Sequence, residues 1–224
     1  MIKFSGYTSR WEFILNKCRD KKVLHLGCIG ITEGSLFDKL EAMRNGFVIH
    51  AHIRRVAREI LGIDYDLETV KALNKLGYLE IVYGDATKLN ELQIEPNIKF
   101  DVIVAGDLIE HLSNPRDMLV GVRRFMNRDS EVIITTPNAF GGLHFVRYVL
   151  SRYREGNDHI LSFNIYTLSN LLERYGFKVS EAWTCYNHPP FTYRQRVKYS
   201  LGIPVFKVVP KLGGTLCVVA RLSP

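Results

Sequence analysis

Glycine and aspartate residues end or follow short apolar runs of this chain, where they could bind a polar ligand. Gly27 and Gly30 follow the first run, and Asp64, Asp85 and Asp107 accompany three later ones. Glycine has no Cβ, so the backbone of such a turn can approach a ligand closely. A carboxylate accepts hydrogen bonds from hydroxyl groups and can also hold a cation. These residue types therefore predict a binding site for a polar small molecule.

Apolar runs alternate with helical patterns through the first 138 residues, and this alternation must position the polar side chains. Buried strands are expected at 23–26, 60–66, 79–82, 100–105 and 131–136. Helices are expected within 1–20, 33–46, 49–58, 67–76 and 115–125. Such alternation is typical of a parallel sheet with helices on both faces. Ligands bind at the carboxyl ends of the strands in these sheets, so the glycines and aspartates should meet at one edge.

The remaining segments lie outside this alternation. Two more helices and two strands are expected at 141–156, 164–175, 177–186 and 214–222. We predict a single domain over 1–224, with 141–165 and 187–213 as insertions on the substrate side. Residues 1–20 are expected to form a helical cap, in which Tyr7, Arg10 and Trp11 either close over a ligand or cover the sheet edge.

The composition indicates a globular protein of one domain. Of the 224 residues, 46% are hydrophobic and 24% are charged, and no apolar run approaches the roughly 20 residues of a membrane span. The first residues lack the apolar block of a signal peptide, so we expect a cytoplasmic protein. The net charge of +7 favours phosphorylated substrates, nucleic acid or an anionic membrane surface as partners. Four scattered cysteines are expected to stay reduced, in neither a disulfide nor a zinc site: Cys18, Cys28, Cys185 and Cys217.

An adenosine-type cofactor would suit the predicted edge. It needs a glycine turn for its polar tail, a carboxylate for its ribose hydroxyls and a further polar group for its adenine. Asp64 ends the second strand about 35 residues after the glycines, which is the position for the ribose. Hydrogen bonds to a charged group contribute roughly 1.5–3 kcal/mol each. The substitution Asp64→Ala should therefore weaken cofactor binding at least about tenfold.

These segments together resemble the class I S-adenosylmethionine-dependent methyltransferases, in particular the subgroup with Glu-His-Leu after the fourth strand (methyltransferase types 11 and 12). The resemblance covers about residues 20–182 and rests on Val23–Gly30, Gly62–Asp64, Gly84–Ala86, Phe100–Ile103, Glu110–Pro115 and Thr135–Asn138. It implies an α/β, Rossmann-like, doubly wound sheet of seven strands in the order 3-2-1-4-5-7-6, with strand 7 antiparallel.

The resemblance also implies the cofactor, S-adenosylmethionine, and its contacts. Gly27, Cys28 and Gly30 would lie at its methionine part, Asp64 on its ribose, and Asp85 and Ala86 at its adenine, with Tyr65 and Asp107 as further contacts. Two positions depart from the family pattern. His25 stands where the family usually has an acid, and Ile31 stands where it has a third glycine.

Methyl transfer to a hydroxyl group benefits from a base or a metal that removes the proton. The candidate bases are His111 and His159. Asp107, Glu110, His111 and His159 are also similar to the divalent-metal ligands of ubiquinone-pathway O-methyltransferases and small-RNA 2′-O-methyltransferases. Asp107 is one methylene shorter than the glutamate of that pattern. Mixed carboxylate and imidazole ligands suit Mn²⁺ or Zn²⁺. Without a metal, Glu110 and His111 would simply pack the end of the strand.

Aromatic and basic residues dominate the expected acceptor side: Phe145, Arg147, Tyr148, Arg152, Tyr153, Arg154, Phe191, Tyr193, Arg194 and Arg196. They favour O-methylation of a small-molecule or glycan-type acceptor. The alternatives are a metal-dependent RNA 2′-O-methyltransferase, a quinone-precursor O-methyltransferase and a non-catalytic binding protein. The basic stretches 143–154 and 191–211 could also contact a membrane surface. A nicotinamide dehydrogenase is disfavoured, because the chain has no Gly-x-Gly-x-x-Gly turn.

Overall fold

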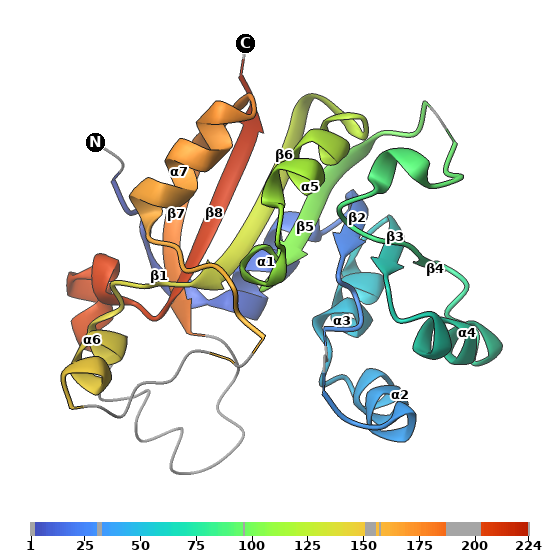
Figure 1. Cartoon of the computed structure of the whole chain (residues 1–224), viewed down its shortest axis with the longest axis horizontal. Coiled ribbons are helices and arrows are strands. Elements are labelled where there is room, and N and C mark those ends of the chain that lie inside the picture. The colour runs from blue at the N-terminus through green and yellow to red at the C-terminus, as the bar shows by residue number, and fades with distance from the viewer. Residues whose placement is uncertain are drawn as a thin grey trace.

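The structure is a computed structural model that describes residues 3–30, 33–95, 97–150, 156, 158–186 and 203–223. A single sheet forms its centre, and helices lie on both faces (Figure 1). The strands are β1 (Gly6–Ser9), β2 (Lys22–Leu26), β3 (Glu59–Asp64), β4 (Ile81–Tyr83), β5 (Phe100–Gly106), β6 (Met126–Pro137), β7 (Phe177–Tyr186) and β8 (Thr215–Leu222). The strands predicted from apolar runs are all present, with bounds that differ by a few residues.

The sheet has eight strands in the order β1-β7-β8-β6-β5-β2-β3-β4. Read from the β4 edge, the seven strands after β1 follow the predicted order 3-2-1-4-5-7-6. The predicted antiparallel strand is β8, which runs antiparallel to both β6 and β7. The eighth strand is a difference from the prediction, because β1 pairs in parallel with β7 and extends the sheet by one strand.

The helices are α1 (Arg10–Cys18), α2 (Leu36–Arg44), α3 (Ile49–Val56), α4 (Leu67–Lys75), α5 (Pro115–Arg123), α6 (Gly142–Val149) and α7 (Ile165–Arg174). Short 3₁₀ turns form η1 (Leu89–Glu91), η2 (Ile109–His111) and η3 (Pro210–Leu212), and residues 203–208 are also helical. The prediction of one helix over 1–20 is wrong for residues 6–9. These residues are extended because the open edge of β7 takes up their backbone hydrogen bonds.

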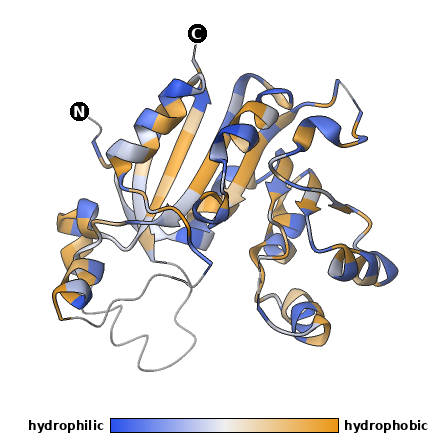
Figure 2. Cartoon of the chain, viewed as in Figure 1, coloured by the Kyte–Doolittle hydropathy of each residue, from blue (hydrophilic) through white to orange (hydrophobic). Residues whose placement is uncertain are grey.

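Alternating side chains bury both faces of the central strands. On β5, Ile103 packs with the helices α5 and α7 on one face, whereas Val102 and Val104 pack with α1 and α3 on the other. Figure 2 shows the apolar strands at the centre and the mixed polarity of α5 and α7 that cover them. The sequence therefore builds a three-layer domain, and the carboxyl ends of its parallel strands remain open to bind a ligand.

The helix starts agree with capping chemistry. Ser35 caps α2 with its hydroxyl on the Asp38 amide, and Asp66 caps α4 with its carboxylate on the Thr69 amide. Asn164 caps α7 in the same way. The extra helix predicted within 33–46 is confirmed as α2. Its Lys39 pairs with the Asp66 carboxylate at 2.7 Å, which ties α2 to the start of α4.

The expectation that all cysteines stay reduced is wrong for two of them. Cys185 on β7 and Cys217 on β8 form a disulfide, whereas Cys18 and Cys28 are buried thiols. The antiparallel pairing of β7 with β8 brings the two Cα atoms to 6.5 Å, a distance that a disulfide spans. Their separation of 32 residues in sequence hides this proximity.

Helix α6 confirms part of the helix expected at 141–156, and none of its side chains is buried. Its exposed residues include Phe145, Arg147 and Tyr148. The other predicted acceptor-side residues lie outside the described part of the chain: Arg152, Tyr153, Arg154, Phe191, Tyr193, Arg194 and Arg196. Within the described residues, no helix is long and apolar enough to cross a membrane.

Candidate functional site

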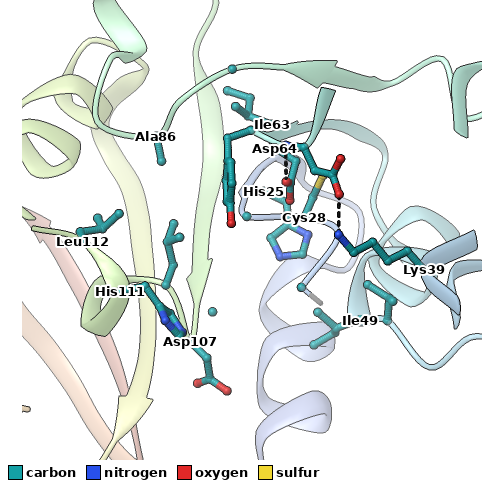
Figure 3. Close-up of a pocket in the computed structure, with 18 of the residues that line it drawn as sticks. His25, Cys28, Lys39, Ile49, Ile63, Asp64, Ala86, Asp107, His111 and Leu112 are labelled. Atoms are coloured by element: carbon teal, nitrogen blue, oxygen red, sulfur yellow. Dashed lines mark hydrogen bonds and ion pairs between the residues drawn. The ribbon is translucent and has the colours of Figure 1, made fainter. Parts of the chain in front are cut away.

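A cavity of about 900 Å³ opens at the carboxyl ends of β2 to β5 (Figure 3). This volume is typical of a small-molecule site. Every residue predicted to contact the cofactor lines it: Gly27, Cys28, Gly30, Asp64, Tyr65, Asp85, Ala86 and Asp107. Figure 3 shows His111 and Leu112 on one side of the cavity and Lys39 on the other. The topology therefore brings together residues that lie far apart in sequence, as the sheet prediction required.

The glycine turn after β2 forms one wall of the cavity. Gly27 and Gly30 both have a φ of +65°, a conformation that other residues adopt only at a cost. The Gly27 amide donates to the Ile63 carbonyl at 2.9 Å, which holds the turn against β3. A Cβ at Gly62 would lie 2.8 Å from the Cys28 sulfur, so only glycine at that position allows this packing. Burial raises the pKa of the Cys28 thiol well above its ordinary value, which keeps it protonated.

Asp64 lies buried at the end of β3, beside the turn. Its Oδ2 accepts the Ile29 amide at 2.9 Å, and its Oδ1 accepts the Asp66 amide at 3.1 Å. Burial raises the pKa of the Asp64 carboxyl, and the two amide donors oppose this shift. Each carboxylate oxygen can accept more than one hydrogen bond. The two amides therefore fix the orientation of the carboxylate and leave it able to accept ribose hydroxyls.

Asp85 and Ala86 follow β4 on the adenine side of the predicted site. The Asp85 Oδ1 accepts the Thr87 amide at 2.8 Å and the Thr87 hydroxyl at 2.7 Å. This local turn places Asp85 and Ala86 in the cavity wall. Lys39 on α2 also lines the cavity, and the sequence does not predict this because α2 is not a strand end.

His25 replaces the expected acid and is almost completely buried. Its Nδ1 lies 3.1 Å from the Nδ1 of His50, and the two rings stack with centroids 5.3 Å apart. One ring nitrogen must donate and the other accept for this hydrogen bond to form. Burial lowers the pKa of His25 well below its ordinary value, with the neighbouring His50 and Arg10 adding to the effect. A neutral imidazole therefore stands at this position.

Asp107 follows β5 in a left-handed conformation, with a φ of 47°. Its Oδ1 accepts the Thr135 hydroxyl at 2.9 Å, and its amide donates to the Thr135 carbonyl at 2.9 Å. Its Oδ2 forms an ion pair with Arg10, the first residue of α1. Arg10 and Trp11 line the cavity, so these two residues of the predicted cap do reach the ligand space.

Glu110, His111 and His159 form a cluster whose candidate ligand atoms all lie within 4.8 Å of one another. The rings of His111 and His159 meet edge to face, with centroids 4.8 Å apart. The Glu110 carbonyl accepts the amides of Ile160 and Leu161 at 3.0 Å, which ties the segment after His159 to η2. This contact explains how a histidine 48 residues further along the chain reaches the end of β5.

The predicted set of four metal ligands is only partly assembled. Asp107 does not belong to the cluster, because its carboxylate is held by Thr135 and Arg10. The Glu110 carboxyl is almost fully buried, and burial raises its pKa to about 7. Within the described residues, neither of its oxygens has a hydrogen-bond partner. Glu110, His111 and His159 are thus the residues that could hold a divalent cation.

A comparison with known protein families identifies the family to which the chain belongs. A family profile described as a methyltransferase domain matches residues 19–182. The chain belongs to this methyltransferase family. The profile runs from just before β2 into the first part of β7, and it includes all of the residues that line the cavity except Arg10 and Trp11.

A curated relative of this chain is a probable S-adenosylmethionine-dependent methyltransferase of Mycolicibacterium smegmatis. It is 26% identical over 178 residues, which cover 76% of this chain and 57% of the relative. The chain thus matches only a little over half the length of that protein.

Solved structures share the fold at low sequence identity. A SAM-dependent methyltransferase from Archaeoglobus fulgidus superposes with a TM-score of 0.54 at 18% identity, covering 94% of this chain and 90% of that one. Magnesium protoporphyrin IX methyltransferase from Synechocystis, solved with bound S-adenosylhomocysteine, gives a TM-score of 0.53 at 13% identity, covering 95% and 79%. At these identities, both similarities concern the fold of this chain alone.

The Mycolicibacterium relative is named for S-adenosylmethionine and the Synechocystis structure holds S-adenosylhomocysteine, which agrees with the cofactor that the resemblance implies, S-adenosylmethionine. The cavity fits it, because the glycine turn leaves space for a polar tail beside an oriented carboxylate, Asp64. The roles of the individual lining residues toward the cofactor stay predictions.

Proposed function

We propose that this chain transfers the methyl group of S-adenosylmethionine to a hydroxyl oxygen of a small-molecule or glycan-type acceptor. When bound, the cofactor supplies a methyl group activated on a sulfonium. The observation that carries the proposal is the position of His111. Its ring lines the same cavity as the cofactor residues and is held by a carboxylate.

His111 has the arrangement of a general base. Its Nδ1 lies 3.3 Å from the Asp158 Oδ2 and 3.2 Å from the Asp158 carbonyl oxygen. A proton on Nδ1 satisfies both acceptors, and Nε2 then carries the lone pair that can remove a proton from a hydroxyl group. His159, in contact with the His111 ring, is the second candidate base. The cavity walls supply the positioning that in-line methyl transfer requires.

A divalent cation is the alternative to a histidine base. Glu110, His111 and His159 would hold it, and the unpartnered, buried Glu110 carboxyl favours this reading. A cation there would lower the pKa of an acceptor hydroxyl. Two imidazoles and one carboxylate suit Mn²⁺ or Zn²⁺ better than Mg²⁺. This alternative carries with it the acceptors of metal-dependent enzymes, a 2′-hydroxyl of RNA or a quinone precursor.

Cofactor binding is tested by a calorimetric titration with S-adenosylhomocysteine. We expect Asp64→Ala to weaken binding at least about tenfold, since it removes the acceptor for the ribose hydroxyls. Glu68→Ala is the matched control, because Glu68 is an exposed carboxylate on the neighbouring α4 that does not line the cavity. Equal affinities of the two variants would refute the role of Asp64.

Catalysis is tested by transfer of a labelled methyl group from S-adenosylmethionine to a panel of monosaccharide, phenolic and RNA acceptors. With a histidine base, His111→Gln should lower kcat about 10²–10⁴-fold and EDTA should have no effect. With a metal, EDTA should abolish transfer and Mn²⁺ or Zn²⁺ should restore it. Cofactor binding without transfer to any acceptor would favour the non-catalytic binding protein.

Nucleic acid and a membrane surface remain predicted partners, and the RNA acceptors of the same panel test the first of them. Nucleic acid as acceptor predicts RNA binding that weakens strongly with salt. A peripheral membrane contact would use 143–154 and 191–211, of which residues 151–154 and 191–202 lie outside the described chain. A cytoplasmic location is likewise a prediction.

A further inference from the structure

Arg10 is a buried cation in the cavity wall that methyl transfer to a hydroxyl group does not use. Only 8% of the residue is exposed, and it lines the cavity as the first residue of α1. Within the described residues, its Nε has no hydrogen-bond partner. Burial lowers the pKa of Arg10 to about 10, so the guanidinium remains charged at neutral pH. A charge at such a position needs an anion beside it.

Asp107 forms an ion pair with Arg10 in this structure, the charge of Glu110 also acts on Arg10, and the backbone of Asp107 is left-handed. A left-handed conformation is uncommon at residues other than glycine, and such residues cluster at ligand sites. Thr135 fixes the Oδ1 of Asp107, so Oδ2 points to Arg10. The Asp107 side chain is 28% exposed, which leaves it open to the cavity. Charge, backbone conformation and exposure together indicate that this carboxylate meets a ligand.

The ion pair lies next to the glycine turn. A Cβ at Gly27 would be 3.3 Å from the side chain of Leu108, so the residue after Asp107 covers the turn. The charge of Arg10 also acts on His25, two residues before Gly27. The pair thus stands beside the part of the cavity that the methionine portion of the cofactor should occupy. His25 itself is neutral and provides no anion for an ammonium group.

We propose that Arg10 and Asp107 together bind the amino-acid end of the cofactor. The Arg10 guanidinium takes the α-carboxylate, for which its planar fork of donors is suited, and the Asp107 carboxylate takes the α-ammonium. The pair and the zwitterion each carry no net charge. Exchange of the internal ion pair for two pairs with the ligand therefore keeps every buried charge compensated. The proposal rests on the proposed cofactor function, and it replaces the family's acid at position 25 with residues from α1 and the end of β5.

Two ligands separate the amino-acid end from the rest of the cofactor. S-adenosylhomocysteine carries this end, whereas 5′-methylthioadenosine has the same adenosine and thioether without it. We expect Arg10→Met and Asp107→Asn each to weaken S-adenosylhomocysteine binding about 10- to 100-fold by calorimetry, because each removes a charge-assisted contact. Both variants should bind 5′-methylthioadenosine within about threefold of the unchanged protein, which also shows that they are folded.

Lys17→Met is the matched control, since Lys17 is a cation of the same helix that pairs with Glu131 and Glu181 away from the cavity. It should leave both affinities unchanged. Arg10→Lys keeps the charge without the fork and should give an intermediate loss for S-adenosylhomocysteine alone.

The outcomes distinguish this inference from the proposed function. If the unchanged protein binds neither ligand, the cofactor function fails. If it binds both, but Arg10→Met and Asp107→Asn weaken both ligands equally or neither of them, the cofactor function stands and the assignment of Arg10 and Asp107 is wrong.

Discussion

The charge of the cavity is determined by a few individual residues. His25 is the clearest case, because it places a neutral ring where the related proteins are expected to carry an acid. It is held there by His50 on α3, through the hydrogen bond between their Nδ1 atoms. The cavity loses one negative charge at the glycine turn by this exchange. The anions that remain near that turn are Asp64, which accepts the Ile29 amide, and Asp107 after β5.

A buried neutral histidine makes stability depend on pH. The pKa of His25 is lowered in the folded chain, whereas the unfolded chain binds a proton near pH 6.5. The unfolded state therefore binds more protons as the pH falls below about 6.5, and the free energy of unfolding decreases. His50 and Arg10 are the neighbouring groups that oppose protonation of the ring.

We expect the free energy of unfolding to fall between pH 7 and pH 5, and to fall less in His25→Asn. Urea unfolding curves at four or five pH values measure both slopes. Identical slopes for the two proteins would show that His25 does not stay neutral in the folded state.

At this scale the sequence predicts the residues that follow apolar strands. Gly27, Asp64 and Asp85 could be named because parallel strands end at one edge. For Arg10 the sequence leaves two predictions open, a contact with the ligand or cover for the sheet edge, since no pattern ties a residue before the first core strand to the cavity. For its partner Asp107 the sequence predicts both a cofactor contact and a metal ligand, because sequence spacing does not show which neighbour a carboxylate contacts.

Among the elements, the tight packing of β3 against the turn after β2 determines the cavity wall. Gly62 on β3 faces both the Cys28 sulfur and the His50 ring, and a Cβ there would lie 2.8 Å from an atom of each. These neighbours belong to the turn and to α3. A single methyl group at Gly62 would therefore push on two elements at once.

We expect Gly62→Ala to destabilise the chain by about 1–3 kcal/mol, the usual range for overpacking. Gly106→Ala on β5 is the control, because its Cβ would stand at an ordinary 3.6 Å from the Thr135 hydroxyl. It should change stability by under about 1 kcal/mol. Chemical unfolding measures both values, and equal losses would contradict the packing argument.

Sequence patterns predict the long apolar elements of this chain and do not predict the short one at its start. Strands β5 and β8 follow from apolar runs, and helix α3 follows from a helical stripe. Strand β1 was missed because Gly6–Ser9 is four residues long and has no apolar run. Its extended form comes from pairing with β7, a contact between the two ends of the chain.

The whole molecule is organised around one sheet. The cavity lies at the carboxyl ends of β2 to β5, and a disulfide joins β7 and β8, the last two strands in the sequence. The order of seven strands could be predicted from the family resemblance, and the eighth could not. The disulfide between Cys185 and Cys217 was also missed, because it depends on the register of β7 against β8. It lies on the half of the sheet formed by β1, β7 and β8, away from the cofactor residues of β2 to β5.

We expect Cys185→Ser to lower the free energy of unfolding by about 3–4 kcal/mol, because the disulfide closes a long loop in the unfolded chain. Urea unfolding measures the loss. Alkylation of the unfolded, unreduced protein followed by mass spectrometry provides the check. Alkylation of both Cys185 and Cys217 before any reductant is added would contradict the pairing.

The strand-end cavity is expected to bind the cofactor of a methyltransferase. A calorimetric titration with S-adenosylhomocysteine, with and without EDTA, measures this binding. We expect one molecule to bind per chain with an affinity that EDTA leaves unchanged, because the cofactor residues are distinct from Glu110, His111 and His159. The absence of binding at about millimolar ligand in both buffers would contradict the account.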